Sequence, residues 1–502
     1  MIRPAVYYNL YFLKNQKNKG FPLPSGLVYT FSFLKTFSIK QKFRYYLMKF
    51  NNRKHRIFEY QQFRIFLNMN IPNSTLPRIV IIGGGFAGIA LAKKLKNKKV
   101  QVVLLDKHNY HTFQPLLYQV ATGGLEAGSI AYPIRKVIQE YDDVYFRLTN
   151  VQEIDTKNQK IITEIGELKY DYLVIATGSK TNYFGNKEIE RNSMAMKTIP
   201  QSLNIRSLIL ENFEQAVLTT DLAEQNSLIN FVLVGGGPTG VELAGALAEM
   251  KKAILQKDYP DLDIAKMQIN LIQSGDRILN TMSEESSQAA EKFLISLGVK
   301  IWKNVRVTNY DGRTITTNSD LTFETATVIW TAGVQGALVA GLDGKSLVEK
   351  VERIRVNEYS QVIGYNNIFA IGDIASMESE TYPQGHPMMA QPAMQQGELL
   401  GENLVKLIEN KPMEAFQYND KGSMATIGRN KAVVDLPKYH FSGIFAWFVW
   451  MFVHLFSLIG FKNKAVVFLN WVYNYIRFDR EGRLIIRPYK KKSFTTFTSD
   501  EV

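Results

Sequence analysis

With 502 residues the chain has room for two or three domains, and its lack of cysteine excludes disulfide scaffolds, thiolate-ligated iron–sulfur clusters and dithiol redox centres. The net charge of +14 lies at the two ends: residues 1–68 hold 13 Lys and Arg against one Glu, and residues 461–492 hold nine against two acids. Basic clusters beside aromatic runs favour an anionic membrane surface over a nucleic-acid groove.

Residues 1–68 are basic, aromatic and without a clear helical period. Two interpretations stay open for them. Many Lys and Arg with almost no acid are typical of a transit peptide. Alternatively, Met69 stands just before the first predicted strand, where a natural translation start is expected. We favour the second interpretation, in which residues 1–68 come from a start assigned too far upstream.

The first predicted domain begins with an apolar strand at 79–82, followed by Gly83, Gly85 and Gly88 and a basic helical run. A second apolar strand then ends on Asp106. This order is the nucleotide-binding βαβ fingerprint. The first glycine allows the tight turn, the second lets the backbone approach a pyrophosphate at the helix N-terminus, and the third lets helix and strand pack closely. The acid is placed to accept hydrogen bonds from ribose hydroxyls.

The segment 107–124 reads KHNYHTFQPLLYQVATGG and resembles the type II NADH dehydrogenases, single-chain flavoproteins that pass electrons from NADH to membrane quinone. Related disulfide reductases and sulfide:quinone reductases carry redox cysteines in or near this part, so the lack of cysteine argues against both groups. The resemblance covers about residues 78–490. It implies an α/β fold with two Rossmann-like dinucleotide-binding domains, the NAD domain inserted in the FAD domain, and a C-terminal membrane-anchoring helical tail.

Three strands that break at a turn match motifs of the resembling enzymes, and two of them mark where the domains connect. One ends in Thr177 and Gly178, where the chain leaves the FAD domain, and another leads to Gly333, where it returns. A third delivers Asp373, which in this superfamily bonds the flavin ribitol. The resemblance therefore implies FAD as cofactor. Non-covalent binding is expected because no cysteine is available for a thioether link.

Another apolar strand, beginning at residue 231, is followed by Gly235, Gly237 and Gly240. This repeats the fingerprint about 150 residues after the first one and implies a nicotinamide site opposite the flavin. Glu242 lies in the first turn of the following helix, where it favours the macrodipole. In the resembling family a glutamate here lies by the nicotinamide and flavin rings and is implicated in linking them to the quinone side. The next strand ends on Gln273, where NADH-preferring relatives usually carry glutamate. Glutamine can bond the ribose but does not repel a 2′-phosphate, so NADH is expected as substrate with tolerance of NADPH.

Residues 385–397 open another helix, in which Gln391 and Gln395 lie four residues apart on one face. The resembling enzymes carry Ala-Gln-x-Ala-x-Gln here, beginning at the position of Ala390, where the helix start meets the flavin ring and the quinone head group. The resemblance implies a catalytic role for both glutamines. Some relatives have histidine in place of Met394, so the proton donor used there is not available.

Residues 441–461 contain no Lys, Arg, Asp or Glu and have the length of a transmembrane helix, but their aromatic content suits a membrane interface better. The next run, 465–477, has a helical period. Its expected apolar side holds Phe468, Trp471, Val472 and Tyr475, and its expected polar side holds Asn470, Asn474 and Arg477. The resembling family ends in such a helix pair, inserted one leaflet deep, ahead of a strand like 483–486. A monotopic anchor is therefore favoured over a spanning helix.

The predicted parts are an N-terminal extension (1–68), two FAD-domain segments (76–195 and 335–420), an NAD(P)H domain (196–334) and a C-terminal membrane-binding region (421–502). The predicted function is FAD-dependent electron transfer from NADH to membrane quinone without proton pumping. A soluble NAD(P)H-dependent flavoprotein reductase and a flavoprotein similar to apoptosis-inducing factor, with a structural role, stay as alternatives.

The expected location is the cytoplasmic face of a bacterial inner membrane, contacted through residues 441–477. The mitochondrial inner membrane is the alternative if residues 1–68 are a transit peptide. No metal centre and no nucleic-acid partner is predicted. The sequence leaves open which quinone is used and whether the chain forms a homodimer.

Overall fold

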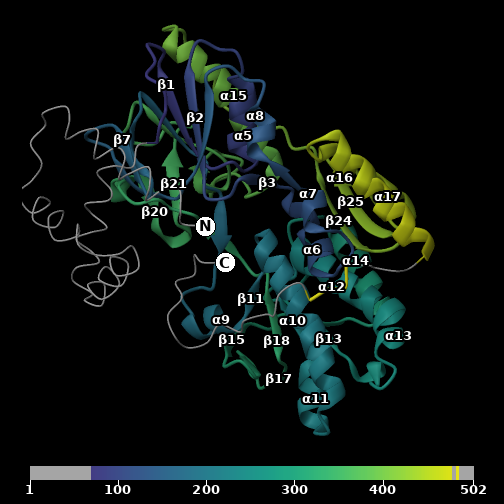
Figure 1. Cartoon of the computed structure of the whole chain (residues 1–502). Coiled ribbons are helices and arrows are strands. Elements are labelled where there is room, and N and C mark those ends of the chain that lie inside the picture. The colour runs from purple at the N-terminus through teal and green to yellow at the C-terminus, as the bar shows by residue number, and fades with distance from the viewer. Residues whose placement is uncertain (1–68, 478–481, 486–502) are drawn as a thin grey trace, which may run out of the picture. The chain divides into compact units, whose positions relative to one another are not determined.

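The computed structural model describes residues 69–477 and 482–485. The two interpretations of residues 1–68 therefore lie outside the described residues, as does residue 486 of the strand expected at 483–486. Residues 483–485 belong to no strand. Two parallel five-stranded sheets organise the described chain (Figure 1).

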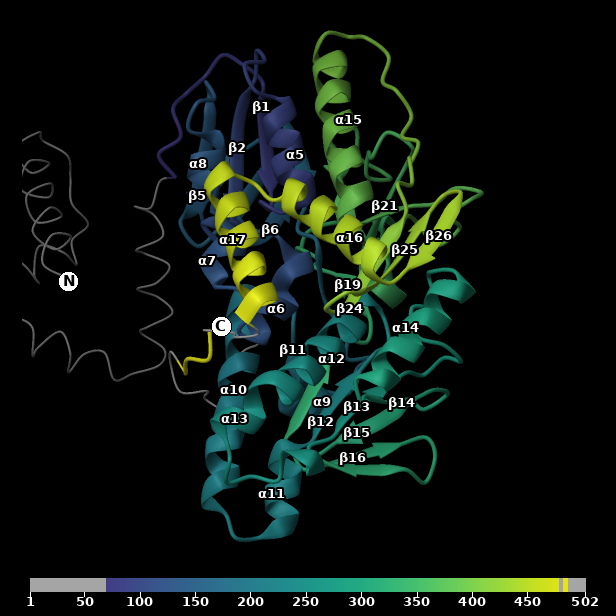
Figure 2. The same cartoon turned by 90° about the vertical axis from the view of Figure 1, so that its right-hand side faces the viewer.

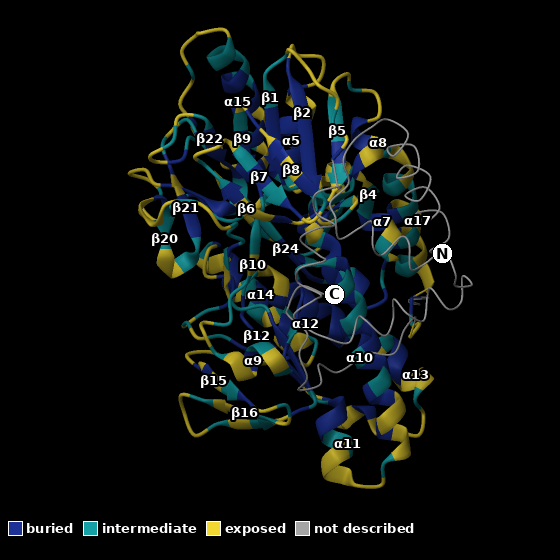
Figure 3. Cartoon of the chain, turned by 60° about the vertical axis from the view of Figure 1, so that its left-hand side comes forward, coloured by how far each residue is buried: buried dark blue, intermediate teal, exposed yellow. Residues whose placement is uncertain are grey.

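The strands of the first sheet are, in spatial order, β22 (Ile368–Ala370), β9 (Tyr172–Ile175), β1 (Arg78–Ile82), β2 (Gln101–Asp106) and β5 (Val144–Leu148). Its helices are α5 (Phe86–Lys94), α8 (Ile134–Ile138) and α15 (Ala390–Ile408). Ile79 and Ile81 pack against these helices, whereas Val80 and Ile82 pack on the other face. Because both faces are buried, β22, β9, β1 and β2 are apolar along most of their length rather than alternating, whereas the edge strand β5 is largely not buried (Figure 3).

Two small sheets, one antiparallel and one mixed, cover that other face. They consist of β6 (Val151–Asp155), β7 (Lys160–Thr163) and β8 (Gly166–Lys169), and of β20 (Leu347–Val348), β21 (Arg353–Val356) and β23 (Ala375–Met377). The first domain is thus layered as small sheets, parallel sheet and helices.

The second sheet repeats this layering. Its strands are β11 (Met194–Ala195), β18 (Thr327–Trp330), β12 (Phe231–Val234), β13 (Ile269–Ile272) and β14 (Lys300–Trp302). Helices α10 (Ile199–Leu218), α11 (Leu222–Ile229), α12 (Pro238–Met250) and α14 (Glu284–Ser296) contribute to the core on one face. On the other face, the core is shared with β15 (Val307–Tyr310) and β16 (Thr314–Thr317), which form a small sheet with β17 (Thr322–Glu324).

The second domain is inserted in the first, because β22 follows every strand of the second sheet in the chain and yet completes the first sheet. The two connections run side by side: β10 (Ser179–Thr181) pairs antiparallel with β19 (Val334–Gly336). Gly178 and Gly333, which precede these strands, both have positive φ. The predicted fold class is confirmed. β11, inside the range 76–195 predicted for the FAD domain, already pairs with β18 of the second sheet.

A C-terminal unit packs against α12 (Figure 2). It consists of β24 (Ser423–Gly428), β25 (Lys431–Leu436), β26 (Tyr439–Ser442), α16 (Ile444–Ser457) and α17 (Phe461–Arg477). α12 and β24 approach closely because Gly245 has no side chain; a Cβ there would lie 1.8 Å from the carbonyl oxygen of Ile427. Gly443 and Gly460, both with positive φ, flank α16 and break the stretch 441–461. In the described part of the chain, no helix is long and apolar enough to cross a membrane.

The predicted sides of α17 were wrong. Trp471 is buried and donates a 2.8 Å hydrogen bond to Gln119. Asn474, expected on the opposite, polar side, also turns inward and donates a 3.1 Å bond to the carbonyl oxygen of Gly124. Phe468 and Val472 are instead exposed. The polar groups turn inward because they bond to polar groups of the protein body.

The outer surface of α16 and α17 is consequently apolar, and we refer to its exposed large side chains as the apolar face. They are Ile444, Phe445, Phe448, Phe452, Val453, Phe456, Phe461, Phe468, Leu469, Val472, Tyr473 and Ile476.

Candidate functional site

The first glycine loop joins β1 to α5. Gly83 has a φ of 112°, and a Cβ on it would lie 2.2 Å from a backbone oxygen that follows β9. A Cβ on Gly88 would lie 1.9 Å from the carbonyl oxygen of Gly83. By contrast, a Cβ on Gly85 would meet nothing within 4 Å, so the loop is open at the position predicted for a pyrophosphate. The Asp106 carboxylate accepts a 2.6 Å bond from the N–H of Gly84, which holds the acid beside the loop.

The second loop, between β12 and α12, has the same construction. Gly235 has a φ of 111°, and a Cβ on Gly240 would lie 2.0 Å from its carbonyl oxygen. Gly237 again faces open space. The amide oxygen of Gln273 accepts a 2.9 Å bond from the N–H of Gly236, as Asp106 does in the first loop. The structure therefore places Gln273 in the position of the acid.

Two predicted FAD contacts lie close together. The hydroxyl of Ser179, next to Gly178, donates a 2.5 Å bond to the Asp373 carboxylate, and Lys197 Nζ lies 3.8 Å from the same oxygen. The hydroxyl oxygen of Thr177 is buried and has no hydrogen-bond partner among the described residues. A buried polar atom without a partner is rare and commonly marks a ligand contact.

The two predicted glutamines of α15, which begins at Ala390, both reach the segment 419–422. The amide of Gln391 donates a 2.9 Å bond to the carbonyl oxygen of residue 422 and accepts a 3.2 Å bond from the N–H of residue 421. The amide of Gln395 makes the same pair of bonds with residue 419, at 2.9 and 3.0 Å. The glutamines thus tie α15 to the chain that enters the C-terminal unit. Their role toward a quinone stays a prediction.

Gln396 is a site residue that the sequence reasoning missed. Its side-chain oxygen accepts a 2.7 Å bond from the N–H of Gly372, the residue before Asp373. It therefore fixes the turn that presents the carboxylate. It follows Gln395 directly in sequence, and a helical wheel would have placed it on a different, buried face.

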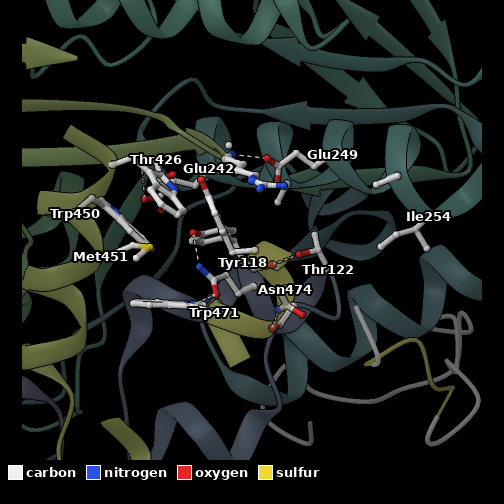
Figure 4. A pocket seen from close by; sticks show the side chains of 18 residues that line it. Tyr118, Thr122, Glu242, Glu249, Ile254, Thr426, Trp450, Met451, Trp471 and Asn474 are labelled. Atoms are coloured by element: carbon white, nitrogen blue, oxygen red, sulfur yellow. Dashed lines mark hydrogen bonds between the residues drawn. The ribbon is translucent and has the colours of Figure 1, made fainter. Parts of the chain in front are cut away.

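A cavity of about 140 Å³ lies beneath α16 and α17 (Figure 4). Its walls come from α6 (Leu117–Ala121) and the turn after it, from α12, from the turn between β24 and β25, and from the inner sides of α16 and α17. The side chains that matter most here are Tyr118, Glu242, Glu249, Thr426, Trp450 and Trp471. The cavity therefore joins both domains to the C-terminal unit.

Glu242 is the buried acid of this cavity. Burial raises the pKa of its carboxyl group to about 8, although a 3.4 Å bond from the N–H of Thr426 and the nearby Trp450 indole lower it in part. The carboxyl group is consequently protonated at neutral pH. The indole N–H of Trp450 lowers the pKa of the Glu242 carboxyl group as a weak hydrogen-bond donor, but it reaches full hydrogen-bonding geometry with no described atom. The inner end of the cavity thus has an N–H without a partner.

The imidazole of His454 lies behind Trp450, at the Glu242 end of the cavity. It stacks on the Trp450 indole with ring centroids 4.2 Å apart, and its Nδ1–H donates a 2.8 Å bond to the carbonyl oxygen of Trp450. Burial lowers the pKa of His454 to about 4, so the ring is neutral at physiological pH. The cavity beside Glu242 therefore gains no positive charge from this histidine.

Comparison with known proteins decides the family. Residues 77–397 match the family model described as pyridine nucleotide-disulphide oxidoreductase, and residues 421–481 match the NDH2 C-terminal domain. The chain is 38% identical over 423 residues to the type II NADH:quinone oxidoreductase Ndh of Mycobacterium tuberculosis, covering 82% of this chain and 90% of that protein. The chain belongs to the type II NADH:quinone oxidoreductase family. A second member from the same organism, NdhA, is 34% identical, covering 78% of this chain and 86% of that protein.

Solved structures agree with this family at the level of the fold. NDH2 of Plasmodium falciparum, solved in complex with NADH, superposes with a TM-score of 0.74 at 23% identity, covering 82% of this chain and 100% of that one. The sulfide:quinone oxidoreductase of Aquifex aeolicus gives 0.63 at 21% identity, covering 80% and 95%. The fold described above is thus shared with solved members of the family and with a related quinone reductase.

The sequence reasoning found Glu242 but missed the cavity around it. Tyr118, Trp450 and Trp471 come from three elements separated by up to about 350 residues, and no local pattern connects them. The one signal available was that the motif segment 107–124 contains Tyr118. That segment lies against α17, as the bond between Gln119 and Trp471 demonstrates.

Proposed function

We propose that the chain transfers electrons from NADH to a membrane quinone through non-covalently bound FAD, without moving protons across the membrane. Family membership, two open glycine loops and the cavity beneath α16 and α17 support this function. The reaction is NADH + H⁺ + quinone → NAD⁺ + quinol. FAD supplies a centre that takes a hydride from NADH and returns the electron pair to the quinone.

The residues of the first domain fit FAD. Gly85 would leave room for the pyrophosphate at the N-terminus of α5, and Asp106 would hold the adenosine ribose. Thr177, whose buried hydroxyl has no partner among the described residues, and Asp373 would hold the flavin half of the cofactor. The second loop, at Gly237, would hold the pyrophosphate of NADH.

The cavity is the proposed site of the quinone head group, and its position is the observation that carries the proposal. It lies directly inside the two helices that bear the apolar face, so a lipid-soluble substrate has a short route to it. Aromatic walls such as Trp450 and Trp471 suit a planar ring. The Trp450 N–H, which has no partner among the described residues, would donate a hydrogen bond to a quinone oxygen.

Glu242 has the role of proton donor in this proposal. Quinone reduction consumes two protons, and NADH delivers only one with its hydride, so the second must come from the medium. A carboxyl group with a pKa of about 8 is protonated at neutral pH and lies in the cavity wall. Loss of that proton to a quinone oxygen would complete the quinol.

The apolar face is the proposed membrane contact. It holds a dozen large apolar side chains on two short helices, which matches a monotopic anchor rather than a soluble surface. Lys462 and Lys464 on α17 would meet anionic lipid headgroups. We place the enzyme on the cytoplasmic face of a bacterial inner membrane; the mitochondrial inner membrane is the alternative, and it depends on residues 1–68.

Gln273 supports tolerance of NADPH. It occupies the position of the ribose-binding acid without its negative charge. The arginine nearest in sequence, Arg277, does not offer a phosphate site, because its guanidinium donates to the carbonyl oxygens of Met282 and Asn280 at 3.0 and 2.9 Å. NADH is therefore expected to remain the better substrate.

The quinone site is tested by filling the cavity. Ala246→Leu adds bulk to the cavity wall on α12, and Lys252→Leu changes an exposed residue nearby as a control. Stopped-flow reduction of the flavin by NADH should be unchanged in both variants, whereas reoxidation by quinone should slow at least tenfold only in Ala246→Leu. Equal slowing of both half-reactions would contradict the quinone site. A wild-type enzyme that reduces soluble acceptors but no lipid-soluble quinone would favour the soluble reductase.

A further inference from the structure

Two carboxylates lie along one wall of the cavity. Glu242 and Glu249 are two turns apart on α12, with Ala246 between them on the same face. The helical rise puts their backbones roughly 10 Å apart. Beyond Glu249 the helix continues as a π-helical turn (Lys251–Leu255), whose Ala253 and Ile254 also line the cavity. Such turns occur frequently at functional sites because they change the direction of side chains.

The two ends of the cavity differ in exposure and charge. Glu242, Thr426 and Trp450 are buried, whereas Glu249 and Arg429 are half-buried. Figure 4 shows Trp450 at the end near Glu242 and Ile254 at the end beyond Glu249. Glu242 therefore lies at the buried end of the cavity, and Glu249 lies toward its more exposed end.

Arg429 and Tyr475 hold the outer end in place. The N–H of Arg429 donates to the Glu249 carboxylate, and its guanidinium carbon lies 3.8 Å from the centroid of the Tyr475 ring. Arg429 and Tyr475 thus lie at the Glu249 end of the cavity, while Tyr118 and the neutral His454 behind Trp450 lie near Glu242.

The space between the carboxylates can hold water. A water needs roughly 10–15 Å³ of such volume, so a cavity of about 140 Å³ accommodates several molecules. Polar side chains of Tyr118, Thr122 and Asn474 line it and offer hydrogen-bond partners. The Trp450 N–H adds a donor that no described protein atom satisfies.

We propose that Glu249 and the water of this cavity form a path that returns a proton from the solvent to Glu242 after each turnover. This inference rests on the proposed function. In the step, Glu242 releases its proton to a quinone oxygen and becomes a carboxylate. Glu249, protonated by solvent, then passes a proton along the water to Glu242 and is itself reprotonated. One proton enters per quinol, which matches the overall reaction.

Glu249→Gln tests the path in the full-length enzyme on lipid vesicles containing quinone. Glu242 begins protonated, so the first reoxidation of reduced flavin by quinone should keep its wild-type rate. Steady-state turnover should fall roughly tenfold, more steeply as pH rises from about 6 to about 9, because solvent protons become scarce. Added formate or imidazole should restore it. Glu249→Asp should retain most of the turnover, and Glu285→Gln, an exposed glutamate on α14, serves as the control.

Three results would overturn the inference: wild-type turnover in Glu249→Gln, equal slowing of the first and later turnovers, or no rescue by small acids. If Glu249→Gln fails to retain flavin, Glu249→Asp provides the test instead. A steady-state turnover of Glu249→Asp as low as that of the cavity-filling variant Ala246→Leu would equally refute the path. Failure of the proposed function looks different. In that case Glu242→Gln itself leaves quinone reduction unchanged, whatever Glu249→Gln does.

Discussion

Replacing Glu242 by glutamine should change how the stability of the protein depends on pH. The carboxyl group is almost fully buried on α12, where the N–H of Thr426 donates a hydrogen bond to it. Glutamine has nearly the same shape and carries no charge at any pH. The substitution therefore removes the titration while it keeps the packing.

The sign follows from the raised pKa. Between the unfolded value of 4.5 and the folded value of about 8, the folded protein binds the proton more tightly than the unfolded chain, so stability falls as pH rises through this window. At ~1.4 kcal/mol per pKa unit, the full cost above pH 8 is about 5 kcal/mol, of which roughly 2–3 kcal/mol develops between pH 5 and pH 7. The stability of the Glu242→Gln variant should not fall in this way as the pH rises.

Thermal unfolding followed by flavin fluorescence, from pH 5 to pH 9, measures the effect. For a chain of this size roughly 1–2 °C per kcal/mol is expected, so the variant should gain about 3–5 °C relative to wild type between pH 5 and pH 7. Glu285→Gln, at an exposed position, should run parallel to wild type. If the Glu242→Gln profile were also parallel, the carboxyl group would not be held neutral by burial, and its role as proton donor would lose its physical basis.

Three further predictions concern the nucleotide, the membrane and the cofactor. Gln273→Glu should raise the KM for NADPH at least tenfold and leave that for NADH nearly unchanged, because ~1.4 kcal/mol of charge repulsion already corresponds to tenfold; strict rejection of NADPH by the wild type would contradict this. Phe452→Asp, at a 62% exposed position of the apolar face, should weaken vesicle binding at least tenfold in sedimentation assays without loss of flavin, whereas Leu218→Asp, at an 82% exposed position on α10, should not. Acid precipitation should release all the yellow colour, and colour retained in the pellet would indicate covalent FAD.

Much of the site could be predicted from the sequence because its parts are local. The loops at Gly83–Gly88 and Gly235–Gly240 depend on a strand, a turn and a helix that are consecutive in the chain. Gln273 could be identified as the counterpart of Asp106 because strand register fixes where each strand ends beside its glycine loop. The absence of cysteine by itself separates the chain from disulfide-dependent relatives of the same fold.

The cavity and the orientation of α17 were decided only by the tertiary structure. Helical periodicity identified the apolar residues of α17, but it could not indicate that Phe468 and Val472 would be exposed while Asn474 would bond to the carbonyl oxygen of Gly124 inside. Likewise the position predicted for Glu242, in the first turn of its helix, was wrong, since α12 begins at Pro238 and has no acid in its first turn. Only Thr426 and Trp450, roughly 200 residues later, enclose the Glu242 carboxyl group. Burial by segments that are distant in sequence raises the pKa of Glu242. A local sequence pattern cannot indicate which distant segments will cover a residue.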